Sequence, residues 1–538
     1  MNKFSSPLRL IALFGFLALS GWLPAQVFGW AVPGTSTSDI GGMKVVTATN
    51  QDYVVAGIFT GSANFSGTTV TGSANESIFV CRYDSSGALQ WATAFSNSED
   101  LELGGIAAGS NNEVYLAGTF EENLSLGSTL LTNIDDENGF LARLDGSGNV
   151  VWALNIESSE EGSVSAVGVN GAGTVAIAGN FEDDLVLGST TITSAAEEAI
   201  YVAAFDGSGN LQWTGQAESD DEATVFDLAP AGSSDWVMTG LFEDALTAGS
   251  TTLPNASGSD LFLIQFNNTG TVSWAEGIGG TSDVAGLGVT ADGSGNVFVA
   301  GGFDGTADFS PVLTTGGGAD AFLARYNNQG NVQWVSQFSS SADVNALGIH
   351  RAANNRILVT GSIGATATFD TVTVSNNSGQ DLFIVAYNPS GSALFGKGAG
   401  GTSVTGFDVT SDAFDHPVVT GSFQTTAFFD NLTVNGAGGE DFVLAKLYNG
   451  NFTVGTGGND LENTKVTLYP NPVAQKLYFE LLEGSESGEW QLWDAQGRTL
   501  RSVILDPARR WVDVSDLAAG LYLLTQPTTG SSLRFVKE

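Results

Sequence analysis

Cysteine, histidine and basic residues are scarce in this chain of 538 residues. It has one cysteine, Cys81, which excludes an internal disulfide and any metal site that needs several cysteines. Two histidines, His350 and His416, leave little for histidine-based zinc or triad chemistry. Lysine and arginine number 18 against 58 acidic residues, so the net charge is −40. A charge of this size argues against nucleic acid and anionic membranes as partners.

Long apolar runs are missing as well, except near the N-terminus. Met1 to Arg9 is short and basic, Leu10 to Leu19 is apolar, and Ala25 supplies a small residue at a cleavage point. This order is typical of a secretory signal peptide, and the apolar run is short for a bilayer span. We therefore predict a signal peptide at residues 1–25 and no transmembrane segment in the mature chain, with an uncleaved anchor as the alternative.

Helical periodicity is absent from the body of the chain, which instead repeats itself about every 61 residues. Two ladders of residues mark the repeat. The aromatic ladder is Trp30, Trp91, Trp152, Trp213, Trp274, Trp334 and Phe395. The glycine ladder is Gly57, Gly118, Gly179, Gly240, Gly301, Gly361 and Gly421.

Each repeat reads as four short strands separated by turns rich in glycine, asparagine and aspartate. Four strands repeated seven times predict a seven-bladed β-propeller over residues 26–452. The period is longer than that of familiar blade repeats, and the excess lies between the second and third strands. The mature chain begins with a segment around Trp30 that matches the fourth strand of a repeat, and the last repeat ends after its third strand. We therefore expect the N-terminal strand to complete the last blade and close the ring.

The strand-forming segments of these repeats resemble those of the bacterial β-propeller repeat family. The stretch that carries the resemblance best runs from Asp292 to Trp334, and the likeness covers about residues 28–450. It implies the fold, but it brings no activity with it because that family has no uniform function. The aromatic ladder is predicted to pack the blades together, with Trp152 as a buried example.

After a glycine-rich linker, residues 453–464, the repeat stops. Residues 465–538 show alternating strands separated by turns, which predicts a small C-terminal β-sandwich. Four motifs in order closely resemble the C-terminal sorting domain of the type IX secretion system. Their residues are Tyr469, Pro470, Asn471, Pro472, Asp494, Gly497, Gly520, Tyr522 and Lys537.

This second resemblance implies an export route. The signal peptide would take the chain to the periplasm, and the sorting domain would take it across the outer membrane of a Gram-negative host of the Bacteroidota type. In that family a sortase removes the domain, and the cargo is released or attached to surface lipopolysaccharide. The expected location is therefore the medium or the outer cell surface, with the secretion machinery and its sortase as partners.

Acidic residues concentrate in the propeller, where residues 26–462 carry a net charge of −41. Clusters follow the second strand in three successive repeats, at Glu121, Glu122, Glu182, Asp183, Asp184, Glu243 and Asp244. Loops after second strands and loops between blades emerge on the same face, so we expect these clusters to crowd one face. The face is interpreted as a solvated surface, with binding of a cation such as calcium, or of a basic partner, as the alternative.

Other motifs are interpreted as structural. The "DGSGN" words beginning at Asp145, Asp206 and Asp292 have oxygens spaced as in a calcium loop, but they lack the closing glutamate and are interpreted as turns. Cys81 aligns with small or apolar residues of the other repeats and is predicted to be buried in the core. The ladder tryptophans differ in their local pattern from those that dock blades in quinoprotein propellers, so no cofactor is predicted.

The sequence as a whole favours a secreted, non-enzymatic β-propeller that binds or displays an extracellular glycan or protein. Two alternatives stay open. One is an extracellular enzyme that acts on a polymer such as a polysaccharide, with acidic loop residues as general acid and base. The other is a purely structural component of the cell envelope. The fold alone does not choose between them.

Overall fold

The structure is a computed structural model, and its described residues fall into two compact units that divide the chain between residues 452 and 453. The first unit is described over residues 26–448, except 37, 98, 134–136, 378 and 414. The second is described at residues 466–469, 473, 475–481, 488–494, 499–505, 511–518, 520–525 and 532–537. The predicted signal peptide and linker lie outside these residues. Within the described residues, no helix is long and apolar enough to cross a membrane.

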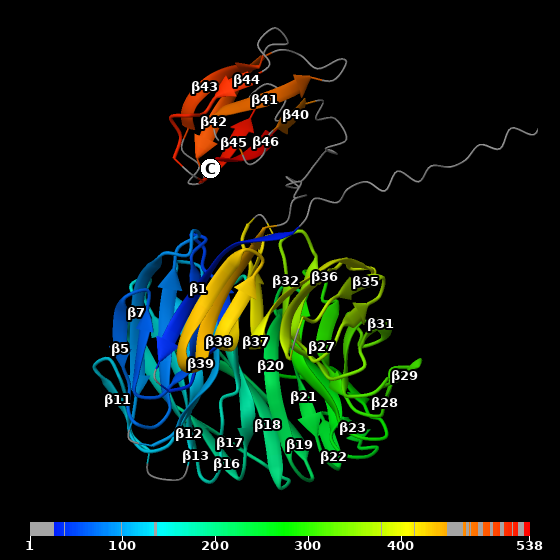
Figure 1. Ribbon diagram of the computed structural model, residues 1–538. Coiled ribbons are helices and arrows are strands. Elements are labelled where there is room, and N and C mark those ends of the chain that lie inside the picture. The colour runs from blue at the N-terminus through cyan, green and yellow to red at the C-terminus, as the bar shows by residue number, and fades with distance from the viewer. Residues whose placement is uncertain are drawn as a thin grey trace, which may run out of the picture. The chain divides into compact units, whose positions relative to one another are not determined.

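Strand pairing groups the first unit into four-stranded antiparallel blades arranged as a propeller (Figure 1). Blade 1 is β2 (Ile40–Thr47), β3 (Tyr53–Phe59), β6 (Ser77–Tyr83) and β7 (Leu89–Ser96). Blade 2 is β8 (Leu101–Ala108), β9 (Val114–Phe120), β12 (Asn138–Leu144) and β13 (Val150–Ser158). Blade 3 is β14 (Ala166–Val169), β15 (Val175–Phe181), β18 (Glu198–Phe205) and β19 (Leu211–Ser219).

The pattern continues around the ring. Blade 4 is β20 (Ala223–Ala231), β21 (Asp235–Phe242), β24 (Asp260–Phe266) and β25 (Val272–Ile278). Blade 5 is β26 (Val284–Ala291), β27 (Val297–Phe303), β30 (Asp320–Tyr326) and β31 (Val332–Ser339). Blade 6 is β32 (Val344–Arg351), β33 (Ile357–Ile363), β36 (Asp381–Tyr387) and the first half of β37 (Ala393–Ser411). Blade 7 is the second half of β37, β38 (Pro417–Phe429), β39 (Leu432–Tyr448) and β1 (Val27–Ser36).

The ring closes through its first strand, as the sequence predicts. Strand β1 pairs antiparallel with β39, from Val27 opposite Tyr448 to Gly34 opposite Phe442. Figure 1 shows the blue β1 lying against the yellow strands of blade 7. The first strand of each blade, which we call the inner strand, contacts the inner strands of both neighbouring blades. The second half of β37 and β2 make this contact across the closing seam. Closure leaves no unpaired seam between the two ends of the propeller.

The residues that lengthen the repeat form a short separate hairpin between the second and third strands in blades 1 to 6, whereas in blade 7 the equivalent hairpin is continuous with β38 and β39. The hairpins are β4 (Ser62–Phe65) with β5 (Thr68–Thr71), β10 (Leu124–Leu126) with β11 (Thr129–Leu131), β16 (Asp184–Leu187) with β17 (Thr190–Thr193), β22 (Ala245–Ala248) with β23 (Thr251–Pro254), β28 (Thr306–Asp308) with β29 (Val312–Thr314), and β34 (Ala367–Phe369) with β35 (Val372–Val374). Four of them pair with the fourth strand of the preceding blade. The extra residues therefore fasten neighbouring blades together.

In six of the seven blades, the ladder glycine lies where the second strand crosses a β-bulge of the inner strand. A Cβ on Gly240 would stand 1.9 Å from the carbonyl oxygen of Thr224, and one on Gly57 would stand 1.8 Å from that of Gly41. The other five ladder positions would meet an inner-strand carbonyl oxygen at 1.7 to 2.1 Å. Only glycine allows the two backbones to approach this closely, which explains the repeat of this residue.

The hydrophobic core lies between adjacent blades. One cluster, for example, joins Val54 and Val80 of blade 1 to Leu116, Phe120 and Phe140 of blade 2, all essentially inaccessible to solvent. Burying such a side chain contributes roughly 1.5–3 kcal/mol. Seven clusters of this kind hold the propeller together by apolar contact between neighbouring blades.

The second unit is a β-sandwich, as predicted. One sheet is β40 (Val466–Tyr469), β41 (Lys476–Leu481) and β44 (Trp511–Asp513). The other is β43 (Thr499–Leu505), β42 (Gly488–Asp494), β45 (Gly520–Thr525) and β46 (Ser532–Lys537). A separate core around Trp490, Leu492 and Phe535 lies between them. This unit therefore has a hydrophobic core of its own.

Candidate functional site

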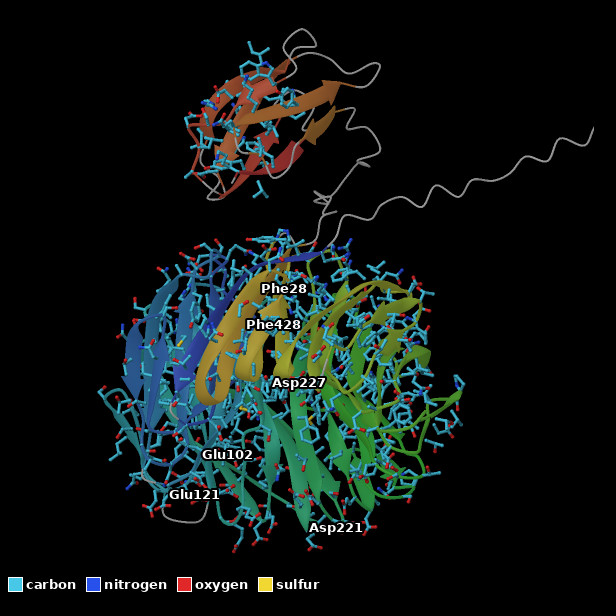
Figure 2. All side chains as sticks on the ribbon, viewed as in Figure 1. Phe28, Glu102, Glu121, Asp221, Asp227 and Phe428 are labelled. Carbon is cyan, nitrogen blue, oxygen red and sulfur yellow. The ribbon has the colours of Figure 1, made fainter. Side chains whose placement is uncertain are left out.

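We name the two ends of the propeller by the loops they carry. The turn face carries the turns between strands 1 and 2 and between strands 3 and 4 of each blade. The hairpin face carries the segments that enter the hairpins and the connections between blades. Glu121 and Asp221 both lie at the hairpin face, at the lower end of the propeller in Figure 2, whereas Asp227 lies nearer its middle.

A cavity of about 320 Å³ lies in the central channel, lined by residues of every blade. Inner strands bulge by one residue in six blades, at Met43, Gly104, Phe226, Leu287, Leu347 and Phe407. The residue after the bulge is Lys44 in blade 1, Asp227 in blade 4 and Asp408 in blade 7, whereas it is glycine in the other three. The ring of residues after the six bulges therefore holds one cation and two carboxylates among three glycines.

Both channel carboxylates bind backbone groups of the next blade. Asp227 accepts hydrogen bonds from the Val289 and Leu228 amides at 2.8 and 2.9 Å. Asp408 accepts from the amides of Val45 and Val409 at 2.9 and 2.8 Å, and the first of these bonds crosses the closing seam.

Burial acts against these bonds and raises the pKa of both carboxyls. The pKa of Asp408 is raised to about 6, with Asp227 adding to the effect and Lys44 opposing it. The pKa of Asp227 is raised as well, again mainly by burial and against the effect of Lys44.

This burial predicts a pH dependence of folding. Because the pKa of Asp408 is higher in the folded chain than in the unfolded one, protonation favours the fold, and this stabilisation is lost as the pH rises from about 4 through about 6. The effect is on the order of 2 kcal/mol. We expect Asp408→Asn to lose less stability between pH 5 and pH 7.5 than the unaltered protein, measured by urea unfolding. Equal losses in the two proteins would contradict this.

A larger cavity of about 550 Å³ lies on the hairpin face, where blade 7 meets blade 1; we call it the seam cavity. Its apolar floor includes Met43, Phe59 and Phe407, two of which are bulge residues of the inner strands. Carboxylates stand at its rim, on Asp39, Glu76 and Glu440. No lysine, arginine or histidine is among its lining residues. The seam cavity therefore combines an apolar interior with a negative rim.

The rim lies in a negative field. The pKa of Glu76 is raised, first by burial and then by the charges of Asp100 and Glu102. The pKa of Glu182 is raised by burial and by nearby carboxylates, Glu161 first among them. Like charges thus act on each other on this face at more than one blade.

Backbone hydrogen bonds bring the acidic segments together in pairs. The amide of Glu121 donates to the carbonyl of Asp100, at 3.1 Å. The same bond joins Glu182 to Glu161 at 3.0 Å and Glu243 to Glu222 at 2.8 Å. The segment after each second strand therefore lies beside the connection from the preceding blade, in three successive blades.

The acidic residues that are candidates for the alternative of a cation site do not converge on one point. Among the described residues, no three acidic, histidine or cysteine side chains lie close enough to hold a metal ion. Glu122, Asp183 and Asp244 each occupy a left-handed backbone conformation, with φ between 52° and 55°. Gly61 and Gly305 take the same place in other blades, with φ of 71° and 68°. Turn geometry therefore accounts for part of the recurrence of acidic residues after the second strands.

Two of the remaining members of this set have local side-chain partners. The carboxylate of Asp184 accepts a hydrogen bond from the hydroxyl of Thr193 on the other strand of its hairpin. Glu243 accepts from the Ser259 hydroxyl at 3.0 Å. The Glu121 side chain is partly exposed. These contacts stay within a single blade.

The left-handed turn gives a simple test at Glu122. A residue with a side chain costs about 1–2 kcal/mol in this conformation, against a smaller entropic cost for glycine. We expect Glu122→Gly to raise the free energy of unfolding by about 0.5–1 kcal/mol, measured by urea unfolding. Glu122→Gln is the control, because it removes the charge and keeps the strain. Equal stability of the two variants would mean that charge, not backbone strain, dominates at this turn.

The "DGSGN" words form turns, as predicted for them. The carboxylate of Asp145 accepts hydrogen bonds from the amides of Ser147 and Asn149 at 2.8 and 3.0 Å. These bonds lower the pKa of Asp145, the side chain of Asn149 contributing most. Asp206 and Asp292 bind the amides of their own turns in the same way. The turn itself therefore occupies these carboxylates.

The ladder tryptophans dock each blade onto the next. The indole of Trp152 lies beside Gly209 of the following blade, and its Nε1 donates to the carbonyl of Gly207 at 3.3 Å. Trp91 and Trp334 make the equivalent bond, at 3.0 and 3.1 Å. The prediction that Trp152 is buried is wrong, because it is only half-buried. Each indole covers a turn at the propeller surface instead of filling the core.

Cys81 and the two histidines occupy structural positions. Cys81 is fully buried, as predicted, and burial raises the pKa of its thiol. His416 is buried beside Asp412, with Nδ1 to Oδ2 at 2.8 Å, and Lys446 pairs with the same carboxylate at 2.9 Å. His350 lines the channel, and burial lowers its pKa to about 4. These partners favour a role in the fold.

The sandwich holds the described part of the predicted sorting motifs. Tyr522 is buried, and its ring stacks on that of Phe535 with 5.5 Å between the ring centroids. Its hydroxyl donates to the Ala518 carbonyl at 2.9 Å. Asp494 ends β42, and its backbone pairs with that of Tyr522. Gly520 begins β45, Lys537 ends β46, and Tyr469 ends β40. Pro470, Asn471, Pro472 and Gly497 lie outside the described residues.

Comparison with protein families identifies this second unit. The model of the secretion system C-terminal sorting domain matches residues 467–536. The chain therefore carries a type IX sorting domain, which directs its export to the medium or the cell surface through the secretion machinery. The match accounts for the sandwich.

The propeller has remote relatives. An uncharacterised WD repeat-containing protein of Acanthamoeba polyphaga mimivirus is 21% identical over 393 residues, which are 64% of this chain and 26% of that protein. The Neurospora crassa Pan2 WD40 domain aligns with 77% of this chain and 91% of its own, at 9% identity and a TM-score of 0.39. The structure titled "YCF48 bound to D1 peptide" aligns with 79% and 96%, at 11% identity and a TM-score of 0.39.

Proposed function

We propose that the exported propeller is a non-enzymatic binding protein, and that its seam cavity takes a basic, partly apolar segment of an extracellular protein. The observation that carries this proposal is the composition of the cavity. Its floor offers apolar contact through Met43, Phe59 and Phe407, and the charged side chains among its lining residues are all carboxylates. A segment with apolar side chains next to lysine or arginine complements both parts.

The charge of the propeller supports the same class of partner. Residues 26–462 carry a net charge of −41, and the acidic segments of blades 2 to 4 gather on the face that holds the seam cavity. A field of one sign steers oppositely charged partners and raises their rate of association, more strongly at low ionic strength. It also disfavours acidic polymers as ligands on this face.

The test is a peptide array probed with the exported protein. The array varies net charge and apolar content independently, and bound peptides are then titrated in solution. We expect basic peptides with apolar residues to bind most tightly, and Glu76→Gln with Glu440→Gln to weaken them at least tenfold. Glu160→Gln is the matched control, since it removes an exposed charge of the same face outside the cavity. An absence of basic binders, or equal weakening by the control, would overturn the proposal.

One observation favours the alternative of an enzyme. Asp227 and Asp408 face the channel cavity, and burial raises the pKa of both, which is a property of many general acids. Against this, each carboxylate is held by two backbone amides. Incubation of the exported protein with a panel of polysaccharides, followed by measurement of new reducing ends, separates the two functions. Hydrolysis that disappears in Asp227→Asn would replace the binding protein with an enzyme.

A further inference from the structure

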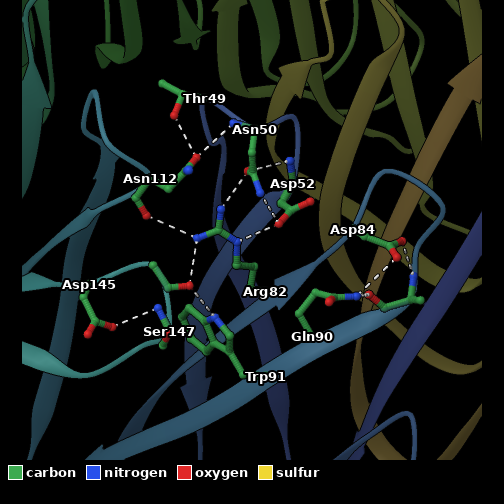
Figure 3. Close-up of polar contacts among 12 residues, drawn as sticks. Thr49, Asn50, Asp52, Arg82, Asp84, Gln90, Trp91, Asn112, Asp145 and Ser147 are labelled. Carbon is green, nitrogen blue, oxygen red and sulfur yellow. Dashed lines mark hydrogen bonds and ion pairs between the residues drawn. The ribbon is translucent and has the colours of Figure 1, made fainter. Parts of the chain in front are cut away.

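One polar network recurs on the turn face with a difference between blades. In blade 1, Arg82 is fully engaged (Figure 3). Its Nε donates to the carboxylate of Asp52 at 2.9 Å, and its Nη2 donates to the Asn50 side chain at 2.7 Å. Its Nη1 donates to the carbonyls of Asn112 and Gly146 at 3.2 and 3.1 Å. The guanidinium of blade 1 is therefore surrounded by protein acceptors.

The Asn112 side chain closes this network from the next blade. Its Oδ1 accepts from the Thr49 hydroxyl at 2.7 Å and from the Asn50 amide at 2.9 Å (Figure 3). Asn112 adopts a left-handed conformation, with φ of 64°. Asn355 has the same conformation at the corresponding turn of blade 6, with φ of 65°. Asparagine is therefore compatible with this backbone position.

Blade 2 keeps the arginine, as Arg143, but this arginine is only partly engaged. Arg143 Nη1 donates to the carbonyl of Gly207 at 3.0 Å, as Arg82 does to Gly146. Its buried Nε has no hydrogen-bond partner among the described residues. Glu113, which stands where blade 1 has Asp52, accepts from the amide of Asn111 at 2.6 Å and forms no ion pair with Arg143 within 4 Å.

The asparagine side chain that closes the network around Arg82 has no counterpart around Arg143. Gly173 takes the position of Asn112 in the next blade, with φ of 82° and open space where a Cβ would stand. A cavity of about 250 Å³ lies there, between blades 2 and 3. Its walls include Glu113, Tyr115, Arg143, Gly173 and Ser208. Gly173, in place of an asparagine, and Arg143, whose Nε has no partner, thus line one cavity.

The chemistry of the walls selects the ligand. Arg143 offers a buried N–H donor, and Glu113, only 6% exposed, offers a carboxylate acceptor in the same cavity. The opposite charges of these side chains disfavour both a free anion and a free cation. A neutral ligand with neighbouring hydroxyls complements both side chains, because one hydroxyl accepts a hydrogen bond from the arginine while another donates one to the glutamate. Tyr115 adds an aromatic ring and a hydroxyl at the cavity wall.

We propose that this cavity is a binding site for a neutral sugar residue, such as the end of an uncharged glycan. Its volume corresponds to about eight water molecules, which is enough for one sugar ring. Arg143 and Glu113 hold the sugar hydroxyls, and Gly173 provides the room. The site lies on the turn face and is separate from the seam cavity of the hairpin face, so either can exist without the other.

The test uses the methyl glycosides of glucose, galactose and mannose as probes for the exported full-length protein. Saturation-transfer NMR detects contact, and titration of tryptophan fluorescence gives the affinity, since Trp152 lies 6.0 Å from Tyr115 between ring centroids. We expect at least one neutral glycoside to bind with a dissociation constant of about 1 mM. Glucuronate and glucosamine test the charge argument, and both should bind at least tenfold more weakly than their neutral parent.

Gly173→Asn is the decisive variant, since it restores the side chain that closes the network in blade 1. It should weaken the bound glycoside at least tenfold while its urea unfolding midpoint stays near that of the unaltered protein. Gly171→Asn is the matched control in the same turn, because Gly171 has open space around it and does not line the cavity. Arg143→Lys should also weaken binding, because lysine keeps the charge but lacks the Nε donor. Absence of binding by all three glycosides, unchanged binding in Gly173→Asn, or a preference for glucuronate would overturn the proposal.

Discussion

Deletion of residues 465–538 is expected to stop the protein in the periplasm. The sorting domain matched at residues 467–536 carries the export signal, and the propeller has no motif of that kind. The predicted signal peptide at residues 1–25 stays in place, so passage through the inner membrane should continue. Fractionation followed by immunoblotting should find the truncated chain in the periplasm and almost none in the medium or on the cell surface.

A control separates loss of the signal from loss of the fold. The propeller and the sandwich have separate cores, so the truncated propeller should still unfold cooperatively after purification from the periplasm. A second control fuses residues 453–538 and the signal peptide to an unrelated periplasmic reporter, which should then reach the outside. Normal arrival of the truncated propeller in the medium would contradict the prediction, and so would retention of the fused reporter.

The fold could be predicted from the sequence because its repeats are physically strict. A ladder glycine such as Gly240 recurs because each inner-strand bulge brings a carbonyl oxygen to about 2 Å from the place of a Cβ. A ladder aromatic such as Trp91 recurs because it covers the turn of the next blade. Both requirements are local to a strand and a turn, so they leave a mark at a fixed spacing.

Features that depend on contacts between blades are harder to predict from the sequence. The sequence shows the segment between second and third strands only as an excess of residues, because a hairpin such as β16–β17 is short and pairs with a different blade. The expectation that Trp152 is buried follows from the predicted role of the aromatic ladder in packing the blades together. Its exposure depends on how much of the indole one turn can cover, and a single sequence does not contain that quantity.

The candidate sites were mostly hidden in the sequence for a related reason. The seam cavity joins Met43 to Phe407, which are brought together only by ring closure. The cavity beside Arg143 arises from a missing side chain, Gly173, and a glycine in a turn gives no signal of its own. Comparison of equivalent positions between repeats could have found it, since Asn112 is replaced by Gly173 while the arginine is kept. The acidic clusters, by contrast, are visible in the sequence, and each lies beside the connection from the preceding blade.

The close approach at the glycine ladder predicts a large effect of a single methyl group. Gly301 and Gly302 are neighbours in β27, but their surroundings differ. A Cβ on Gly301 would stand 1.9 Å from the carbonyl oxygen of Ala285, whereas the nearest atom to a Cβ on Gly302 is 3.8 Å away. Backbone atoms at 1.9 Å cannot give way as a flexible side chain does, so the two strands must separate and lose hydrogen bonds at the bulge.

We expect Gly301→Ala to lower the free energy of unfolding by about 3 kcal/mol or more, at the upper end of the cost of overpacking. Gly302→Ala is the matched control in the same strand, and it should be neutral or raise stability by about 0.5–1 kcal/mol, because alanine has less chain entropy to lose. Urea unfolding of the exported protein measures both. A cost of the same size in the two variants would mean that β27 tolerates no side chain for a reason other than the bulge. A negligible cost in both would mean that the inner strand can move away, in which case the ladder glycines would not be what holds the bulges in register.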